Sequence, residues 1–411
     1  MFRRVRKRLN KLYQTRYATY RELLQPAADW LLPRLPRRVV AGAPWWWRWL
    51  GLYWLLAFLA LHCSGHDVQL TAELRRAFGS TRRKYIAYLL GDRLLRHRDY
   101  TEVTQQLFRR ATWRNCEIHA NFRYIDFVVQ VKGFRTAQLD LMLRRLSGKR
   151  LLPHLTRYQK TRLLIHFLQK NNARKISDIS RQVGARYLDK FSGPLYLMHQ
   201  SVRRGWVSDP HTQMGSEMYR QLVAARSRFE QVIRDNASSF CVVGNAPCEL
   251  GLGKGPLIDS FNIVIRLNDY STEEVADYGS RQTIWVRVAN REVVRHHAPA
   301  NQLVVFSANN FAVKRRDAYQ YLLPLYLARK EFTSIPNHVY QDLIRQLGGL
   351  PSTGLAILYW IYKIIGPIPR RQIFGFTHLS DGSDFAAHYY KDGVEIGVHL
   401  HEWQRETLLM Q

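Results

Sequence analysis

The 411-residue chain carries 62 basic and 32 acidic side chains, which gives a formal net charge of +30. Its hydrophobic content of 46% excludes a disordered chain, and only four cysteines exclude a disulfide-rich scaffold. The excess charge belongs to one part of the sequence. Residues 1–240 hold 45 basic and 16 acidic residues, whereas residues 241–411 hold 17 and 16. We therefore expect a near-neutral C-terminal part, joined to an N-terminal part that faces an anionic partner.

Residues 1–65 are basic and rich in tryptophan, and we expect them to associate with a membrane. The apolar run Trp45–Cys63 contains an uncharged stretch, Trp49–Leu61, of only thirteen residues. A helix needs about twenty apolar residues to span a bilayer. We favour a helix that lies in the interface of an anionic membrane. A spanning signal anchor and an ordinary core helix are the alternatives.

Residues 66–237 are expected to form a mainly helical, basic domain. Apolar side chains recur at spacings of three and four among Arg and Lys in residues 85–110, 157–191 and 217–237. Residues Tyr124–Val131 instead alternate and are rich in β-branched side chains, so we predict a strand there. The arginines of this domain are solvated helix faces or, alternatively, a surface that binds a polyanion.

Residues 238–411 have the pattern of an α/β domain. Short apolar runs at 238–245, 261–268, 283–289, 301–308 and 371–377 predict strands. Helical segments are expected near 315–325, 338–347 and 351–365. Strands that alternate with helices indicate a mostly parallel sheet covered on both faces. In such sheets, ligands bind beyond the carboxyl ends of the strands.

The first stretch of this domain that could carry chemistry is residues 240–255. A predicted strand ends at Gly244 and Asn245, and three more glycines follow. Glycines allow backbone N–H groups to approach a phosphate or ribose, and the Asn amide can both donate and accept. The spacing matches neither the dinucleotide fingerprint nor a Walker loop. An ordinary glycine loop is therefore the alternative.

The second stretch is residues 348–365, where a helix is expected to begin. Ser352 or Thr353 can cap this helix, which leaves N–H groups and the positive end of the dipole to receive an anion. Gly354 would let a ligand come near the backbone. Plain helix capping is the alternative.

The third stretch lies near the C-terminus and carries His388, His399, His401 and Glu406. Histidine is the side chain best suited to take a proton near neutral pH. A residue five positions away does not share a helix face, so the spacing predicts no direct bond between His401 and Glu406. These histidines lack the spacing of a helical zinc site, and the four cysteines lack a metal-binding spacing. We expect no metal.

In this order and spacing, the three stretches resemble the sialylmotifs of the eukaryotic-type sialyltransferases, glycosyltransferase family 29. Residues 241–281, from V-V-G-N through I-D-S and R-L-N to G-S-R, resemble the long motif. Residues 350–376 resemble the small motif. His388-Tyr389-Tyr390 resembles the third motif, and His401 with Glu406 resembles the very small motif. The resemblance covers the near-neutral part of the chain and implies a Rossmann-like, GT-A-variant domain that binds a nucleotide sugar.

The resemblance also implies an activity and a set of residues. The activity is metal-independent, inverting transfer of sialic acid from CMP-sialic acid, with no further cofactor. Asn245 and Asn268 would hold the cytidine nucleotide, together with backbone around Gly244 and Ala246. The start of the helix, at Ser352, Thr353 and Gly354, would contact the donor. His388, supported by Tyr389, would contact the donor phosphate. His401 would be the general base that takes the proton of the acceptor hydroxyl, with His399 as the alternative.

The chain departs from the animal members of this family. There a disulfide joins a cysteine of the long motif to one of the small motif; Cys241 occupies the first position, but residues 346–376 contain no cysteine. The missing partner favours a reducing cytosol. Residues 1–240 resemble no part of the family. We therefore expect a bacterial enzyme at the cytoplasmic face of the inner membrane.

Two other functions stay open. The acceptor would be a membrane-associated glycan such as lipopolysaccharide or lipooligosaccharide core, and CMP-Kdo is then an alternative donor because Kdo is also a 2-keto-3-deoxy sugar acid. A function of another class is non-catalytic binding of a polyanion, for example nucleic acid, through the +29 excess of residues 1–240. Nucleic-acid binding would not require histidines at positions 388 and 401, so we expect no nucleic-acid partner.

Overall fold

The computed structural model describes residues 84–112, 118–184, 193–289 and 303–376, together with residues 406 and 409. The chain separates into two compact units, residues 1–127 and 128–411. The apolar run Trp45–Cys63 lies outside the described residues, so its relation to a membrane stays a prediction. Among the described helices, none is both long enough and apolar enough to cross a bilayer.

The first unit contains α7 (Lys84–Arg96), α8 (Glu102–Thr112) and the beginning of α9 (Ile118–Lys132). The helices predicted over residues 85–110 are thus confirmed. Their core includes a cluster of aromatic rings, in which Phe108 stacks on Tyr124 with 5.8 Å between centroids. The carboxylate of Asp92 pairs with Arg96 of its own helix at 2.8 Å and with Arg123 of α9.

The strand predicted at Tyr124–Val131 is wrong, because these residues lie within α9. The alternation that suggested a strand arises because the helix is buried nearly all round. Apart from Asp126, which is half-buried, every residue from 124 to 131 is buried, including the polar Gln130. A helix buried on most of its faces carries no clean apolar stripe, so its period cannot be read from the sequence.

The second unit begins with further helices: α10 (Ala137–Leu146), α11 (Arg157–Gln169), α12 (Ala173–Val183), α14 (Leu195–Arg203) and α15 (Pro210–Asp235). They confirm the helical periodicity of the described parts of 157–191 and 217–237. Local caps fix their first turns. The side chain of Thr156 accepts from the N–H of Gln159, whose own side chain accepts from the N–H of Thr156, a capping box. Asp209 caps α15 just before Pro210, at the position where proline is tolerated best.

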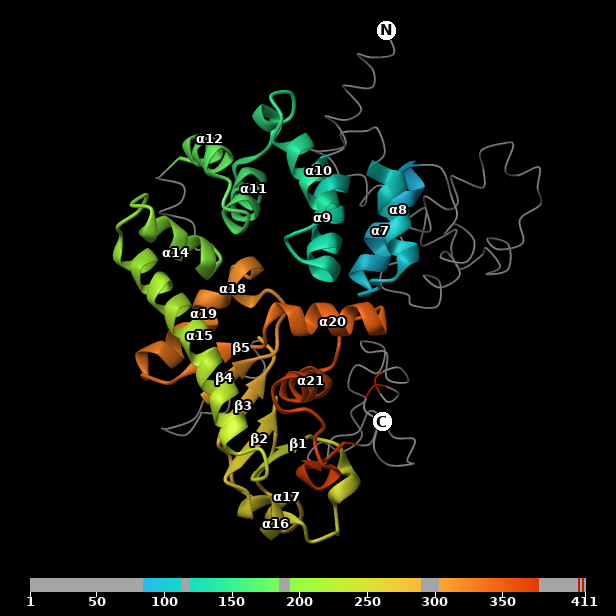
Figure 1. Cartoon of the computed structure of the whole chain (residues 1–411), viewed down its shortest axis with the longest axis vertical. Coiled ribbons are helices and arrows are strands. Elements are labelled where there is room, and N and C mark those ends of the chain that lie inside the picture. Colours follow the sequence, from blue (N-terminus) through green and yellow to red (C-terminus); the bar gives the residue numbers. More distant parts are fainter. Residues whose placement is uncertain are drawn as a thin grey trace, which may run out of the picture. The chain divides into compact units, whose positions relative to one another are not determined.

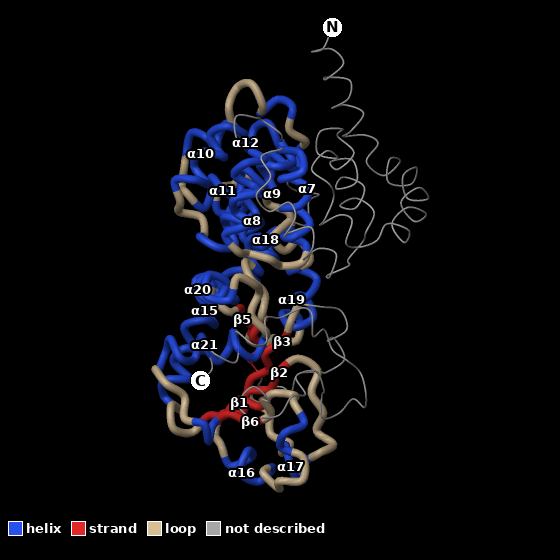
Figure 2. Tube along the Cα trace, turned by 90° about the vertical axis from the view of Figure 1, so that its right-hand side faces the viewer, coloured by secondary structure: helices blue, strands red, loops and turns tan. Residues whose placement is uncertain are grey.

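The sheet of the second unit has six strands, all parallel: β1 (Phe240–Val243), β2 (Ile263–Leu267), β3 (Ile284–Arg287), β4 (Leu303–Phe306), β5 (Phe332–Ser334) and β6 (Ile373–Phe374). Their order is β5-β4-β3-β2-β1-β6; Figure 1 labels β1 to β5, and Figure 2 labels β6 beside β1. The predicted α/β fold with a parallel sheet is confirmed. The sequence pattern missed β5, which has only three residues and no room for a periodic signal.

Helices lie on and around this sheet, as Figure 2 shows with strands in red and helices in blue. They are α16 (Gly255–Ser260), α17 (Val275–Tyr278), α18 (Phe311–Lys314), α19 (Ala318–Leu327), α20 (Asn337–Leu347) and α21 (Thr353–Ile365). One buried cluster joins β1 and β2 to α16 and α17 through Cys241, Ile258 and Tyr278. Another joins β3 and β4 to α14, α15, α18 and α19. Every residue of β1, β3 and β4 is therefore buried, as expected for a sheet covered on both faces.

The register of β2, β1 and β6 brings several predicted site residues to one edge of the sheet. Val243 of β1 lies beside Arg266 of β2 on one side and beside Phe374 of β6 on the other. Because the three strands are parallel, the segments that follow them leave the sheet at the same edge. These segments begin at Gly244, Asn268 and Gly375.

Candidate active site at the carboxyl edge of the sheet

The structure brings together two of the predicted donor-binding residues, Asn245 and Asn268. The amide of Asn245, after β1, donates to the carbonyl oxygens of Leu267 and Asp269, both at 3.0 Å. Asn268 has a φ of 49°, in the left-handed region where Asn is the best-tolerated non-glycine residue. Its side-chain oxygen accepts from the N–H of Val288 at 3.0 Å. Both asparagines therefore stabilise the segments that follow the strands. A contact with a nucleotide would be a second role for these side chains.

Gly244 and Gly354 meet the same aromatic ring, that of Phe376. A Cβ on Gly354 would lie 2.6 Å from the ring of Phe376, and one on Gly244 would lie 2.9 Å from it. A Cβ on Gly244 would also lie 2.2 Å from the carbonyl oxygen of Gly375. The ring thus occupies the space that a side chain at either position would need. Glycine is required at both positions because the start of α21 packs closely against the ends of β1 and β6.

Ser352, rather than Thr353, is the cap of α21, and its side-chain oxygen accepts from the N–H of Leu355 at 3.2 Å. Thr353 and Gly354 form the first turn of the helix, and all three residues are buried. The N–H of Ser352 donates to one carboxylate oxygen of Glu406 at 2.7 Å, and its hydroxyl donates to the other at 2.5 Å. The helix start that was predicted to receive an anion therefore holds a carboxylate of the chain itself.

The contact between Ser352 and Glu406 joins two motifs that are 54 residues apart. Glu406 is completely buried. Burial raises the pKa of its carboxyl group from the ordinary 4.5 to about 7, although the two hydrogen bonds from Ser352 act in the opposite direction. Glu406 therefore exchanges its proton near neutral pH.

The burial of Glu406 makes the stability of the folded chain depend on pH. The folded chain holds the proton of Glu406 more tightly than the unfolded chain does. The stability relative to a Glu406→Gln variant should therefore fall as the pH rises from about 4.5 to about 7, and then level off. The fall should be on the order of 3 kcal/mol, since one pKa unit corresponds to about 1.4 kcal/mol. Urea unfolding of both proteins between pH 5 and pH 8 measures it; a difference that is constant or grows with pH would contradict the assignment.

The glycine loop after β1 is also occupied by a carboxylate of the chain. The N–H groups of Gly251 and Gly253 donate to Asp277 at 2.7 and 2.8 Å. These bonds lower the pKa of Asp277. Both glycines have positive φ, 74° and 61°, which explains why glycine stands there. These two N–H groups point to Asp277, so the ordinary-loop interpretation describes them better than phosphate binding does.

The I-D-S and G-S-R pieces of the long-motif stretch meet in space. The Asp259 carboxylate accepts from the backbone N–H of Ser280 at 2.9 Å and from that of Arg281 at 2.8 Å. Gly279, with a φ of 66°, lies so close to Asp259 that a Cβ would approach its oxygen to 2.4 Å. The middle and the end of the stretch that resembles the long motif are therefore in direct contact.

The R-L-N piece joins the same network through the buried Arg266. Its guanidinium donates to the carbonyl oxygens of Tyr278 at 2.7 Å, Gly279 at 2.8 Å and Arg281 at 2.9 Å. The side chain is 0% exposed. Arg266 lies next to Leu267 and Asn268, so this network also fixes the carboxyl end of β2.

Sequence reasoning missed two residues of this edge, Glu249 and Phe376. The buried Glu249 accepts from the backbone N–H of Gly375 at 3.0 Å and from the ammonium of Lys254 at 2.9 Å. It ties the glycine loop to the segment after β6. The sequence offers one signal for it, an acidic residue five positions before a lysine within an otherwise uncharged glycine loop. Phe376 has no such signal, because only the fold places it between Gly244 and Gly354.

The histidine candidates His388, His399 and His401 lie outside the described residues, as does Tyr389. Their predicted roles therefore stay predictions. Cys241 and Cys248 are free thiols, and Cys241 is buried in β1, where burial raises its pKa to about 12. Within the described part of the chain, no cluster of three or more His, Cys, Asp or Glu side chains could hold a metal ion.

The chain matches no protein-family model, no curated protein and no solved structure. The geometry alone therefore indicates a site. The buried Asn245, the half-buried Asn268, a helix start and close-packed glycines meet beyond the carboxyl ends of β1, β2 and β6, which is where open parallel sheets bind their ligands.

Proposed function

We propose that this chain is a metal-independent, inverting glycosyltransferase that moves a sugar acid from a CMP-activated donor onto a membrane-associated glycan. The donor is CMP-sialic acid, and a lipopolysaccharide or lipooligosaccharide core is the acceptor. The observation that carries the proposal is the contact between Ser352 and Glu406. It joins the stretches that resemble the small and very small motifs, and it does so beside the ends of β1 and β2, where the stretch that resembles the long motif lies.

The chemistry needs few protein groups. The bond between C2 of the sugar acid and the phosphate of CMP breaks, and a bond from C2 to the acceptor oxygen forms on the opposite face. CMP leaves with a single phosphate, whose charge His388 can offset without a divalent ion. The sugar passes through an oxocarbenium-like state, so positioning and one base supply most of the catalysis. The sequence contains no Asp-x-Asp motif of the kind that binds a metal with a nucleotide sugar.

His401 is the proposed base that takes the proton of the acceptor hydroxyl. Five residues of chain reach at most about 18 Å, so Glu406 limits how far His401 can lie from Ser352. Glu406 itself already binds Ser352 with both carboxylate oxygens and is completely buried. We therefore assign Glu406 to positioning the C-terminal segment and His401 to the proton transfer.

The basic N-terminal part of the chain supports the location that we propose, the cytoplasmic face of the bacterial inner membrane. Each basic residue near an anionic membrane contributes on the order of 1 kcal/mol to binding. Residues 1–240 carry an excess of 29 basic side chains, so contact of a fraction of them with the membrane is enough for peripheral binding.

Hydrogen exchange of the full chain with and without CMP tests the location of the donor site. CMP should slow exchange in peptides that contain residues 244–246, 266–269 and 352–355. Bound CMP would contact all three segments and so reduce the opening motions that expose their backbone N–H groups. UMP, which differs in its base, serves as the control and should protect these peptides less. CMP that leaves all three segments unchanged, or protects only other parts of the chain, would contradict the proposed site.

A further inference from the structure

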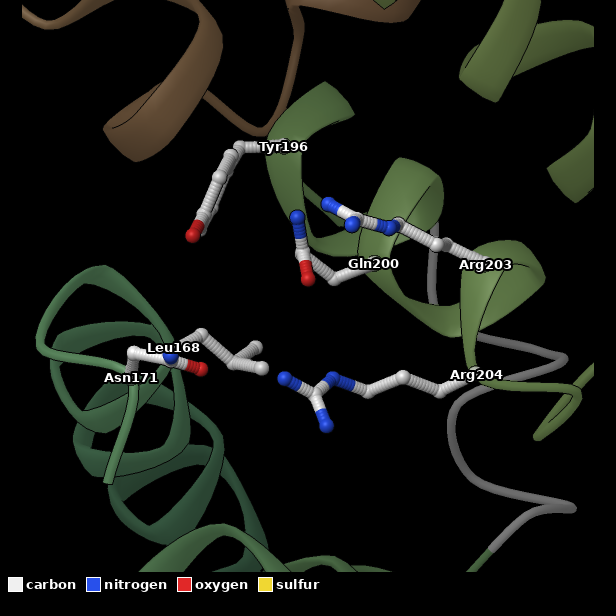
Figure 3. Close-up of a pocket in the computed structure, with 6 residues that line it drawn as sticks. All are labelled: Leu168, Asn171, Tyr196, Gln200, Arg203 and Arg204. Atoms are coloured by element: carbon white, nitrogen blue, oxygen red, sulfur yellow. The ribbon is translucent and has the colours of Figure 1, made fainter. Parts of the chain in front are cut away.

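A cavity of about 440 Å³ lies between α11 and α14, among the helices that precede the sheet in the second unit. Figure 3 shows side chains of α14 reaching toward the end of α11. The six lining residues are Leu168, Asn171, Tyr196, Gln200, Arg203 and Arg204. The volume lies within the range of about 300–1,000 Å³ that is typical of small-ligand sites. The lining contains two arginines and no acidic residue.

The arginines of this cavity have their charges available for a ligand. Within the described part of the chain, neither Arg203 nor Arg204 makes a side-chain hydrogen bond or an ion pair, whereas several other arginines of the helices do. Arg204 lies over the ring of Trp206 at 5.7 Å and also lines a second, adjoining cavity with Arg181. Arg181, by contrast, already pairs with Asp178 at 3.1 Å. A guanidinium is the best side chain for bidentate binding of phosphate or carboxylate.

Neutral polar groups face the same cavity. Tyr196 and Gln200 are 8% and 9% exposed, yet neither side chain forms a hydrogen bond with the described residues. Neither polar group belongs to the described side-chain atoms that are sealed from solvent without a partner, so both are free to bond to a molecule in the cavity. Burial raises the pKa of Tyr196 to about 12, which keeps its hydroxyl protonated as a donor. Asn171, held in the left-handed region with a φ of 51°, adds a third amide or hydroxyl group at the rim.

We propose that this cavity is a binding site for a phosphorylated sugar. The guanidinium groups of Arg203 and Arg204 would take the phosphate dianion, and the polar groups of Tyr196, Gln200 and Asn171 would bind sugar hydroxyls. The two positive charges of Arg203 and Arg204 match the two negative charges of a phosphate group better than the single negative charge of a carboxylate. The inference is independent of the proposed transfer activity, because it concerns residues of α11 and α14 and none at the carboxyl edge of the sheet.

Calorimetric titration of the full chain with glucose 6-phosphate, glucuronate, inorganic phosphate and glucose tests the site, without any CMP compound present. Glucose 6-phosphate should bind most tightly, and glucose should not bind measurably. The variant Arg203→Gln/Arg204→Gln should bind glucose 6-phosphate at least about tenfold more weakly, as expected for hydrogen bonds to a charged group. The variant Arg144→Gln/Arg145→Gln is the matched control, since it removes the same charge from two exposed positions of α10.

Three results would overturn the proposal: no binding of glucose 6-phosphate by the wild type, tighter binding of glucuronate, or equal losses in the two double variants. The last result would mean that only the overall charge attracts the ligand. If the double variant at 203 and 204 does not fold, Tyr196→Phe replaces it, because it removes one hydroxyl and keeps the ring. Tyr196→Phe should weaken binding about two- to tenfold, as for one neutral hydrogen bond, and an unchanged affinity would also overturn the proposal.

Discussion

Replacement of Arg266 by methionine should destabilise the second unit by about 3–5 kcal/mol, the largest loss of stability that we expect from a single side chain in the sheet. Methionine fills much of the same volume but leaves the carbonyl oxygens of Tyr278, Gly279 and Arg281 without their buried donor. Each buried polar group that loses its partner costs about 1–3 kcal/mol. Urea unfolding, followed by tryptophan fluorescence, measures the loss.

Arg281→Met is the matched control for this prediction. Arg281 is exposed, and its guanidinium donates to two carbonyl oxygens at the longer distances of 3.2 and 3.3 Å. Its replacement should cost less than about 1 kcal/mol, because water can solvate the freed carbonyl groups. If Arg266→Met and Arg281→Met reduce stability equally, the network around Arg266 does not hold the long-motif stretch together as we describe.

The variant His401→Ala should lose acceptor-dependent CMP release by a factor of about 10²–10⁴, the usual contribution of a general base. The acceptor hydroxyl would then have to give its proton to water as the new bond forms. Binding of CMP should stay within a factor of about two, since the proposed role of His401 is toward the acceptor. The measurement is the initial rate of CMP release at saturating donor, together with a CMP titration of both proteins.

His399→Ala is the control for the base, because it removes a histidine two positions away. Its rate should stay near that of the wild type. Equal turnover by His401→Ala and the wild type would exclude His401 as the base. A large loss in His399→Ala alone would move the role to His399.

Much of the fold could be predicted from the sequence, because local patterns dominate its strands. All five predicted apolar runs contain a parallel strand, and the helix expected over 351–365 begins at Thr353 because Ser352 caps it. The errors arose where tertiary burial overrides a local pattern. Residues Tyr124–Val131 look like a strand only because the helix that contains them is buried almost all round.

The candidate site could be predicted only in part. Asn245, Asn268 and Ser352 were identified, and the structure brings them to one edge. Their present partners are groups of the chain itself, which a sequence pattern cannot reveal. The spacing argument gave no support for a bond from His401 to Glu406 and named no partner for Glu406. That partner is Ser352, 54 positions away in the chain. Phe376 likewise fills the space at Gly354 only because of the register between β1 and β6.

Turnover of a CMP-activated sugar acid by the wild-type chain tests the central claim most directly. The full chain is incubated separately with CMP-Neu5Ac and CMP-Kdo, in the presence of EDTA and of extracted lipopolysaccharide as acceptor. We predict that CMP-Neu5Ac is consumed, with release of CMP and addition of one sugar acid to the acceptor. Consumption of CMP-Kdo instead would support the proposed transferase activity but change the donor from CMP-sialic acid to CMP-Kdo. If neither donor is consumed with any membrane glycan acceptor, while the chain is folded, the proposed function is wrong.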